Sequence, residues 1–258
     1  MTVQLAGVIL ARDEADFIGE CIASLAWTDE VVVFEWGSTD ATVRIAQDAG
    51  ATVIEHRFEN FAQQRNAALE QVDAEWILFV DADERIPPEL ASEIRTCLEA
   101  PTQPGYYIPR HNYIFGKLTR HAGWYPDYQL RLLKREAVHY DPERRVHERV
   151  VLPDGAEAGY LNPPMIHFNY QNVREFVRKQ RHYAGFDAEI WYREGRRPKL
   201  RNFILQPWRQ FAWRFWTLKG YKDGLHGLGL SLLMAWNEFD KYWQLRRLWR
   251  QDSAADLS

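Results

Sequence analysis

The chain of 258 residues is predicted to adopt an α/β fold, in which helices cover both faces of a mostly parallel sheet. Short apolar stretches typical of buried strands alternate with helix-like segments through the first 100 residues. The composition, 46% hydrophobic and 26% charged, suits one sizeable globular domain with an appendage better than two full domains. Helical patterns return in the C-terminal part, after a stretch of short alternating segments.

The predicted elements of the first 100 residues follow a regular order. Residues 3–10 form an apolar strand, and after a polar loop the apolar residues of 17–25 recur at helical spacing. The same unit then repeats. Further strands are expected at residues 30–34, 51–55 and 75–80, and further helices at residues 42–49, 61–71 and 89–98. Strands and helices that alternate at this length predict a parallel sheet.

Residues 105–167 have a different pattern, with short alternating segments that predict an antiparallel or mixed extension of the sheet. The segments are separated by turns at Pro126-Asp127, Asp141-Pro142 and Pro153-Asp154-Gly155. From residue 173 onward, helical spacing returns. The weakly polar run at residues 225–236 is too short and too rich in glycine to span a bilayer.

Positive charge and tryptophan are concentrated in one part of the chain. Residues 171–250 carry 17 lysines and arginines against 7 aspartates and glutamates, although the whole chain has a net charge of −4. The same segment contains seven of the 11 tryptophans. A basic, tryptophan-rich segment on an acidic body indicates an anionic partner, either nucleic acid or phospholipid.

Phospholipid is the favoured partner. Apolar residues recur at helical spacing over residues 203–216 and are surrounded by arginine and lysine, as in an amphipathic helix at a membrane surface. Aromatic residues at this spacing are more often core, so a mixed role is expected. Since no nucleic-acid-binding motif accompanies them, no nucleic acid partner is expected.

Cysteine usage and the N-terminus both predict a cytoplasmic protein. Cys21 and Cys97 lie in predicted helices and are interpreted as reduced core residues rather than as a disulfide. The N-terminal segment starts directly with a strand and lacks the basic region of a signal peptide.

Two carboxylates appear where the fourth strand ends. Residues 77–84 read Ile-Leu-Phe-Val-Asp-Ala-Asp-Glu, and Asp81 and Asp83 project to the same side of an extended chain. Together they offer oxygen ligands to Mg²⁺ or Mn²⁺. In an open α/β sheet, ligands bind outside the carboxyl ends of the strands, where this pair lies. Capping of the following helix is the alternative for an isolated pair.

Three further polar loops are expected at the same edge of the sheet. Residues 11–14 follow the first strand and residues 35–40, Glu-Trp-Gly-Ser-Thr-Asp, follow the second, where a base and ribose would sit. Helix capping alone is the alternative for residues 35–40. Arg65 lies near the start of the third helix, where backbone N–H groups favour anions, and is a candidate diphosphate contact. A solvated surface arginine is the alternative.

These four loops, in this order, resemble the nucleotide-sugar half of family 2 glycosyltransferases with a GT-A fold. More narrowly, the chain resembles the lipopolysaccharide-core β-glucosyltransferases of bacteria, strongly to residue 150 and more loosely beyond. The residues that carry the family resemblance are Asp13-Glu14, Glu35 to Asp40, Gln64-Arg65-Asn66 and Asp81-Ala82-Asp83-Glu84. The narrower resemblance rests on Gly123-Trp124-Tyr125-Pro126-Asp127, Arg131-Leu132-Leu133, Val146-His147-Glu148, Gly220-Tyr221-Lys222-Asp223-Gly224 and Lys241-Tyr242.

Three positions depart from the family pattern. Glu35 replaces the customary aspartate at the uracil edge, Trp36 replaces a small residue, and Asp13 replaces asparagine. The changes leave the reaction class intact, but base recognition is expected to be shifted or to use a stacking contact.

The resemblance implies a GT-A catalytic domain, which is Rossmann-like, over residues 1–170. Within it, residues 1–100 would bind the nucleotide-sugar and residues 101–170 would form a mixed acceptor half. Residues 171–258 would form a basic, tryptophan-rich helical extension.

The resemblance also implies how a nucleotide-sugar donor is held. Asp83 would bind the divalent cation, Mg²⁺ or Mn²⁺. Asp81 would contact the ribose or the cation, and His147 is a further candidate ligand. Arg65 and Arg131 would offset the charge of the leaving group. The other residues expected to contact the nucleotide are Ala11, Arg12, Glu14 and Glu35.

For the catalytic base, the resemblance favours Asp127, which follows Pro126 in a turn, with Glu148 as the alternative. An ordinary turn residue remains the other interpretation of Asp127, and an interstrand polar pair that of His147 and Glu148. His167 follows a predicted strand and is more often a structural histidine at such a place, although its position near the site keeps it a candidate.

The function implied is that of an inverting, metal-dependent hexosyltransferase. It would move glucose from UDP-glucose to a lipid-linked saccharide such as lipopolysaccharide inner core, on the inner face of the cytoplasmic membrane. Other acceptors, namely polyprenyl phosphate or a capsule or exopolysaccharide intermediate, are alternatives. A nucleotidyltransferase is disfavoured because residues 8–14 lack its glycine-rich loop. A non-catalytic sugar-nucleotide-binding protein is disfavoured because Asp81, Asp83 and Asp127 are all present.

Overall fold

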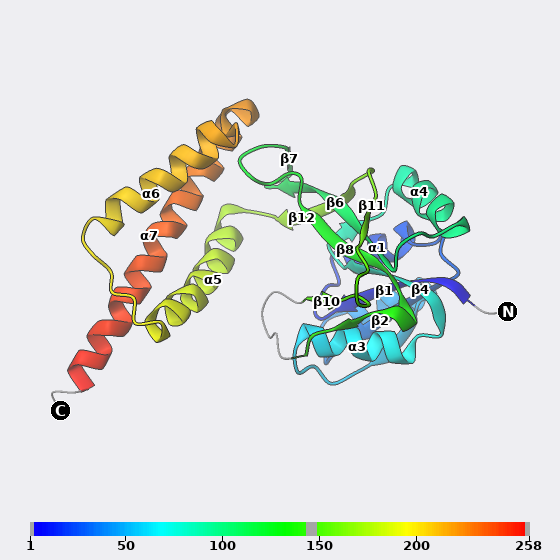
Figure 1. Ribbon diagram of the computed structural model, residues 1–258. Coiled ribbons are helices and arrows are strands. Elements are labelled where there is room, and N and C mark those ends of the chain that lie inside the picture. Colours follow the sequence, from blue (N-terminus) through cyan, green and yellow to red (C-terminus); the bar gives the residue numbers. More distant parts are fainter. Residues whose placement is uncertain (1–2, 143–148, 256–258) are drawn as a thin grey trace. The chain divides into compact units, whose positions relative to one another are not determined.

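The computed structural model describes residues 3–142 and 149–255, which form two compact units (Figure 1). The first, here called the sheet unit, comprises residues up to 111 together with 127–167. The second, the helical unit, comprises residues 112–126 and those from 168 onward. The domain division predicted at residue 170 stays a prediction.

The N-terminal half of the sheet is parallel. Its strands have the order β3-β2-β1-β4, and each of the three neighbouring pairs is parallel. Their bounds are β1 Val3–Ala11, β2 Glu30–Glu35, β3 Thr52–Glu55 and β4 Ala74–Asp81. The helices between them are α1 Ile18–Ser24, α2 Thr42–Asp48 and α3 Phe61–Gln71, and α4 Pro88–Glu99 follows.

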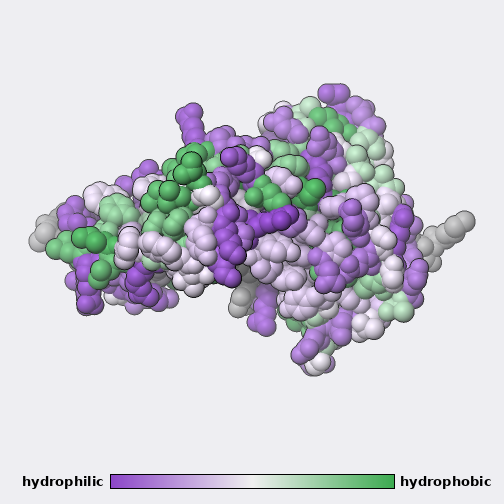
Figure 2. Space-filling view, turned by 90° about the horizontal axis from the view of Figure 1, so that it is seen from above, coloured by the Kyte–Doolittle hydropathy of each residue, from purple (hydrophilic) through white to green (hydrophobic). Residues whose placement is uncertain are grey.

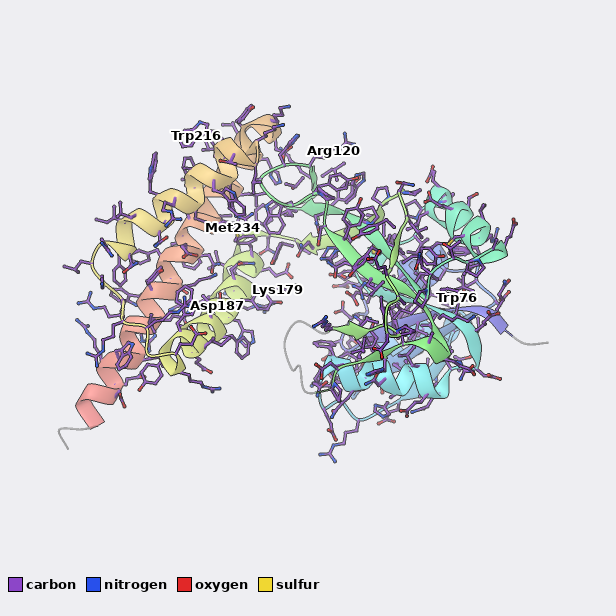
Figure 3. All side chains as sticks on the ribbon, in the orientation of Figure 1. Trp76, Arg120, Lys179, Asp187, Trp216 and Met234 are labelled. Carbon is purple, nitrogen blue, oxygen red and sulfur yellow. The ribbon has the colours of Figure 1, made fainter. Side chains whose placement is uncertain are left out.

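Both faces of this sheet are buried, as the α/β prediction requires. Alternate residues of β1 enter two separate cores, with Ile9 in one and Val8 in the other. The first core contains apolar residues of α1, α2 and α4, and the second contains those of α3. Trp76 of β4 is fully buried in the first core and is labelled in Figure 3. Burial on both faces explains why these strands are continuous apolar runs.

The C-terminal half of the sheet is mixed, as predicted. β8 pairs antiparallel with both β4 and β6, and β12 pairs antiparallel with the short β5. The main strands are β5 Glu84–Arg85, β6 Gly105–Ile114, β8 Tyr128–Lys134 and β12 Met165–Tyr170. Shorter strands are β7 Lys117–Thr119, β9 His139–Tyr140, β10 Val150–Val151 and β11 Gly159–Tyr160.

The helical unit contains long helices that pack along one another, with α7 in contact with both α5 and α6 (Figure 1). Phe176 and Leu230 belong to its small buried core. Within the described residues, none of the helices combines the length and the apolarity needed to cross a bilayer. The elements are α5 Val173–Arg193, α6 Asn202–Ala212, the π-helix Trp213–Thr217, the 3-10 helix Gly220–Asp223 and α7 Gly224–Ala255.

The Gly220 to Gly224 motif ties a loop of the helical unit in place. The Asp223 carboxylate accepts hydrogen bonds from the backbone N–H of His121 at 2.9 Å and from its Nδ1 at 2.8 Å. A Cβ at Gly220 would lie 2.9 Å from the Arg214 carbonyl oxygen, so only glycine fits the close approach. The motif is therefore structural within this unit.

The two cysteines are as predicted. Cys21 is buried and Cys97 is partly buried, and neither is in a disulfide. Burial raises the pKa of both thiols, which favours their neutral form.

Candidate active site

The predicted loops lie together because they follow the carboxyl ends of three neighbouring parallel strands. In the sheet register, Leu10 lies beside Asp81 and Ala11 lies beside Glu35. The loops that follow β1, β2 and β4 therefore start at the same edge of the sheet. This is the edge at which the sequence predicted a nucleotide site.

Hydrogen bonds join the loop after β1 to the loop after β2. The Asp13 carboxylate accepts from the backbone N–H of Thr39 at 2.7 Å and from its hydroxyl at 3.0 Å. These bonds hold the pKa of Asp13 below its ordinary value. The backbone N–H of Glu14 donates to the Thr42 hydroxyl at 2.7 Å. The two loops thus form one rigid rim beside β1.

Glu35 and Arg12 have different positions on this rim. The Glu35 side chain is buried, and its carboxylate accepts from the Ser38 backbone N–H at 3.0 Å. It therefore closes its own loop. Arg12 is exposed, with its Nε 3.6 Å from the Asp13 carboxylate.

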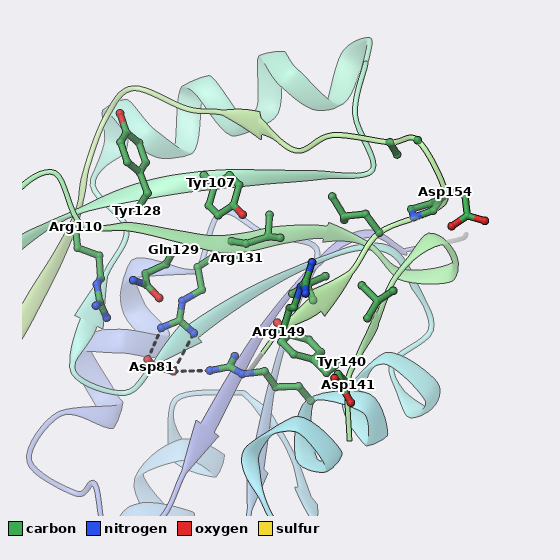
Figure 4. A pocket seen from close by; sticks show the side chains of 18 residues that line it. Asp81, Tyr107, Arg110, Tyr128, Gln129, Arg131, Tyr140, Asp141, Arg149 and Asp154 are labelled. Carbon is green, nitrogen blue, oxygen red and sulfur yellow. Dashed lines mark hydrogen bonds and ion pairs between the residues drawn. The ribbon is translucent and has the colours of Figure 1, made fainter. Parts of the chain in front are cut away.

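Asp81 is held by two arginines. Arg65 approaches one of its carboxylate oxygens at 3.2 Å, and Arg131 contacts both oxygens. Both arginines are buried, and the dashed lines in Figure 4 mark these contacts. Burial alone would raise the pKa of Asp81, but the charges of Arg131 and Arg65 outweigh it and hold this pKa far below its usual range. Asp81 is therefore ionised and fixed.

The network extends through a fully buried glutamate, Glu84. Its carboxylate accepts from the Asp81 backbone N–H at 2.8 Å, from Arg131 at 3.2 Å and from Arg110 at 3.3 Å. Arg110 in turn contacts Asp127 through Nε at 2.8 Å and Nη2 at 2.6 Å. Three arginines and three carboxylates thus form a continuous network with balanced formal charge.

Asp127, the predicted base, lies at the end of this network. Besides Arg110, its carboxylate accepts from the Gln129 side-chain amide at 2.9 Å. These donors fix its orientation. Glu148 and His147 lie outside the described residues.

Asp83 lies apart from the arginines and beside a histidine. Its carboxylate is 3.4 Å from Nε2 of His167, which is buried. Pairing of β5 with β12 puts His167 opposite Glu84 and so brings it to the strand's end. The carboxylate oxygens of Asp83 suit Mg²⁺ or Mn²⁺, and the imidazole nitrogen of His167 is a common ligand of transition metals. Among residues 3–142 and 149–255, no group of three or more His, Cys, Asp or Glu side chains is close enough to enclose a metal; the predicted ligand His147 lies outside these residues.

A cleft of about 980 Å³ adjoins the network (Figure 4). Asp81, Arg65 and Arg131 line it together with Arg110, and Tyr107 and Tyr128 lie on the same side. The wall across from them is formed by residues 140–141 and 149–156. The predicted contacts Ala11, Arg12, Glu14 and Glu35 are outside this lining, at the adjoining strand ends.

Arg110 was missed in the sequence, and the contact of His167 with Asp83 was not predicted. Arg110 had no motif, since its partners Glu84 and Asp127 are distant in sequence. His167 was kept as a candidate beside its structural interpretation, and only the pairing of β5 with β12 brings it to Asp83. The sequence placed His167 after a strand, whereas it lies within β12.

Sequence comparison identifies the class. The model of the family described as "Glycosyl transferase family 2" matches residues 8–143, more than half of the chain. The chain therefore belongs to glycosyl transferase family 2, and it is a glycosyltransferase with the predicted α/β, GT-A type of architecture.

The relatives include a protein of lipopolysaccharide synthesis. The chain is similar to the lipopolysaccharide core biosynthesis glycosyltransferase LpsC of Rhizobium meliloti, with 28% identity over 250 residues and 90% of each chain covered. It is 26% identical to an uncharacterized glycosyltransferase of Rickettsia bellii, covering 100% of this chain and 91% of that protein. The solved structure of S. aureus TarS matches at 17% identity and a TM-score of 0.45, over 70% of this chain and 39% of that chain.

Proposed function

We propose that this glycosyltransferase is a metal-dependent, inverting hexosyltransferase that transfers glucose from UDP-glucose to a lipid-linked saccharide of the lipopolysaccharide inner-core type. The observation that carries the proposal is that the two aspartates of Asp81-Ala82-Asp83 have different partners. Asp81 is ionised between two buried arginines, whereas Asp83 faces His167. The first carboxylate organises the site, and the second is available to a cation.

Charge balance supports the need for a cation. The positive charges of Arg65, Arg110 and Arg131 are already matched by carboxylates within the network. A nucleoside diphosphate brought to this edge would add negative charge that the three arginines of the network do not match; outside the network, the exposed Arg149 also lines the cleft. Asp83 and His167 would hold Mg²⁺ or Mn²⁺, which when bound stabilises the departing diphosphate. We assign the remaining donor contacts to Ala11, Arg12 and Glu14 on the rim.

The reaction we propose is a single displacement. An acceptor hydroxyl oxygen forms a bond to the anomeric carbon while the bond from that carbon to the diphosphate breaks, and the hydroxyl proton passes to the Asp127 carboxylate. Hydrogen bonds from Arg110 and Gln129 hold that carboxylate in place. Glu148 remains the alternative base.

The lipid-linked acceptor is supported by the surface of the helical unit. No residue of α6 is buried, and Figure 2 shows hydrophobic side chains at the surface of this unit. The strongly exposed apolar residues of residues 200–225 include Leu200, Ile204, Leu205, Trp208, Trp216 and Leu225. The exposed basic residues in the same segment are Arg201, Arg209, Lys219 and Lys222. Apolar surface bordered by positive charge suits an anionic phospholipid surface.

The proposed reaction is tested by product analysis. The protein is incubated with UDP-glucose, Mn²⁺ and lipopolysaccharide truncated to its inner core, and the product linkage is determined by NMR. The proposal expects one added hexose in the β configuration, since UDP-glucose carries an α linkage. An α-linked product would refute inversion, and transfer only from another nucleotide-sugar would refute the donor assignment.

The base is tested by Asp127→Asn and Glu148→Gln. The variant that removes the base should lose about 10²- to 10⁴-fold in kcat while retaining UDP binding. Loss in Glu148→Gln alone would transfer the role to that residue.

A further inference from the structure

Three tyrosines form an aromatic surface in the sheet unit: Tyr107 and Tyr128 line the cleft, and Tyr160 packs against both rings. Tyr107 belongs to β6, Tyr128 to β8 and Tyr160 to β11. The rings of Tyr107 and Tyr160 are stacked, with centroids 5.0 Å apart and planes at 22°. Tyr128 meets Tyr160 edge to face at 5.1 Å. We call these residues the tyrosine platform.

The fold brings the platform together through a close backbone approach. β11 pairs in parallel with β6, with Gly159 beside Tyr106 and Tyr160 beside Tyr107. A Cβ at position 159 would lie 2.5 Å from the Tyr106 ring, which only glycine avoids. The Tyr106 hydroxyl accepts from the backbone N–H groups of Thr102 and Gln103 at 2.9 and 3.1 Å, so that ring is fixed.

The platform is exposed despite this ordered packing. Tyr160 retains 62% of its accessible surface and Tyr128 retains 42%. In Figure 4, Tyr107 and Tyr128 lie on the same side of the cleft as Arg110 and Gln129. Rigid aromatic rings beside a few polar groups are typical of a ligand site.

The chemistry of the platform matches a sugar ring. A pyranose presents an apolar face of C–H groups that stacks on an aromatic ring, and its hydroxyls reach polar groups at the rim. Tyrosine combines both properties, since its ring is apolar and its hydroxyl forms hydrogen bonds. Arg110 and Gln129 supply further donors beside it.

We propose that the tyrosine platform binds a pyranose of the acceptor saccharide and directs its hydroxyl to Asp127. Arg110 and Gln129, which hold the Asp127 carboxylate, line the cleft together with Tyr107 and Tyr128. The strand ends assigned to the donor carry Ala11, Glu35 and Asp81 instead. This inference rests on the proposed function, since it names the acceptor subsite of that reaction.

The test is a binding measurement that requires no turnover. Saccharide binding is measured by calorimetry and saturation-transfer NMR with three probes: inner-core oligosaccharide released by mild acid, maltotriose and chitotriose. Tyr160→Ala should weaken the affinity of the bound saccharide about tenfold, because one stacked ring is lost. Tyr160→Phe should retain affinity within about twofold. Tyr183→Ala, which removes an exposed tyrosine of the helical unit, is the matched control and should change nothing.

UDP binding in the presence of Mn²⁺, measured on the same variants, separates this inference from the proposed function. UDP affinity unchanged in Tyr160→Ala, together with weakened saccharide binding, supports the platform. If the wild-type protein binds UDP but none of the saccharides, or if Tyr160→Ala and Tyr128→Ala bind them unchanged, the platform is refuted while the donor site stands. If saccharide binding depends on Tyr160 but UDP never binds, the platform stands and the proposed function fails.

Thermal unfolding separates binding from packing. If the rings served only cross-strand packing, Tyr160→Ala would lower Tm and leave saccharide affinity intact. The inference expects Tyr160→Phe to rescue the affinity, which a general loss of folding would not explain.

Discussion

The sheet unit and the helical unit place the same residue types in opposite ways. In the sheet unit, Arg65 and Arg131 are buried against carboxylates, and Trp76 is enclosed by the core. In the helical unit, Trp208 and Trp216 are about half exposed. Buried charged side chains that are paired with one another are already in position before a small ligand binds. Exposed aromatic and basic residues instead suit a broad, adaptable surface such as a membrane.

Arg214 is the exception within the helical unit. It is partly buried, donates to the Ala122 carbonyl at 2.6 Å, and lies over the rings of Trp124 and Trp213. Burial lowers its pKa to about 10, so the side chain is still positive at neutral pH. Arg214 thus contacts aromatic rings and a carbonyl, whereas Arg65 and Arg131 of the sheet unit contact carboxylates.

Among the substitutions that compare the two units, Asp83→Asn is expected to have the largest effect. The variant keeps the size of the side chain but removes the charge that would hold the cation, so kcat/KM should fall about 10³-fold. Thermal unfolding should be almost unchanged, because Asp83 lies outside the arginine network. Steady-state kinetics with UDP-glucose and Mn²⁺ measures the effect. Full activity in this variant would remove the functional distinction between the two aspartates.

Asp81→Asn should act mainly on stability. The substitution leaves Arg65 and Arg131 buried without their common partner, and we expect a loss of about 2 kcal/mol in the free energy of unfolding. This is below the usual range for a buried pair because the Asp81 side chain retains 36% exposure. Urea unfolding measures the loss, and an unchanged midpoint would contradict a structural role for the network.

The pH dependence follows from the lowered pKa of Asp81. Because the folded-state pKa is depressed, the stabilisation is fully present above the unfolded value of about 3.9 and is lost as pH falls further. Wild-type stability should therefore decline steeply below about pH 4, and Asp81→Asn should show a shallower decline there. Parallel curves for the two proteins would contradict the assigned pairing.

The smallest effect concerns the helical unit. Replacing Trp208 and Trp216 by serine should weaken binding to vesicles with anionic phosphatidylglycerol about tenfold, because exposed apolar area is removed. Binding to UDP should not change. Phe61→Ser removes an exposed aromatic residue of the sheet unit and serves as the control. Equal vesicle binding by all three proteins would reject the membrane surface.

Local patterns in the sequence predicted much of the fold. Helix α3 has the predicted bounds of residues 61–71, because its alanine and leucine spacing and the strands beside it are local signals. Asp81 was placed correctly at a strand's end because an apolar run stops there. The side chains that contact the two aspartates were harder to predict, because they are distant in the sequence. Arg131 lies 50 residues from Asp81, and His167 lies 84 residues from Asp83. Such pairs depend on how β8 and β12 enter the sheet, which no local pattern specifies.

The central claim is that Asp83 and His167 hold the cation that a nucleoside diphosphate requires. Calorimetric titration of UDP, GDP, CDP and dTDP, each with and without Mn²⁺, tests it on the wild-type protein, Asp83→Ala and His167→Ala. Asp48→Ala, an exposed carboxylate of α2, is the matched control. The account predicts Mn²⁺-dependent binding of UDP by the wild-type protein and the control, which is lost in Asp83→Ala and weakened in His167→Ala. Mn²⁺-dependent binding of UDP that persists unchanged in Asp83→Ala would contradict it.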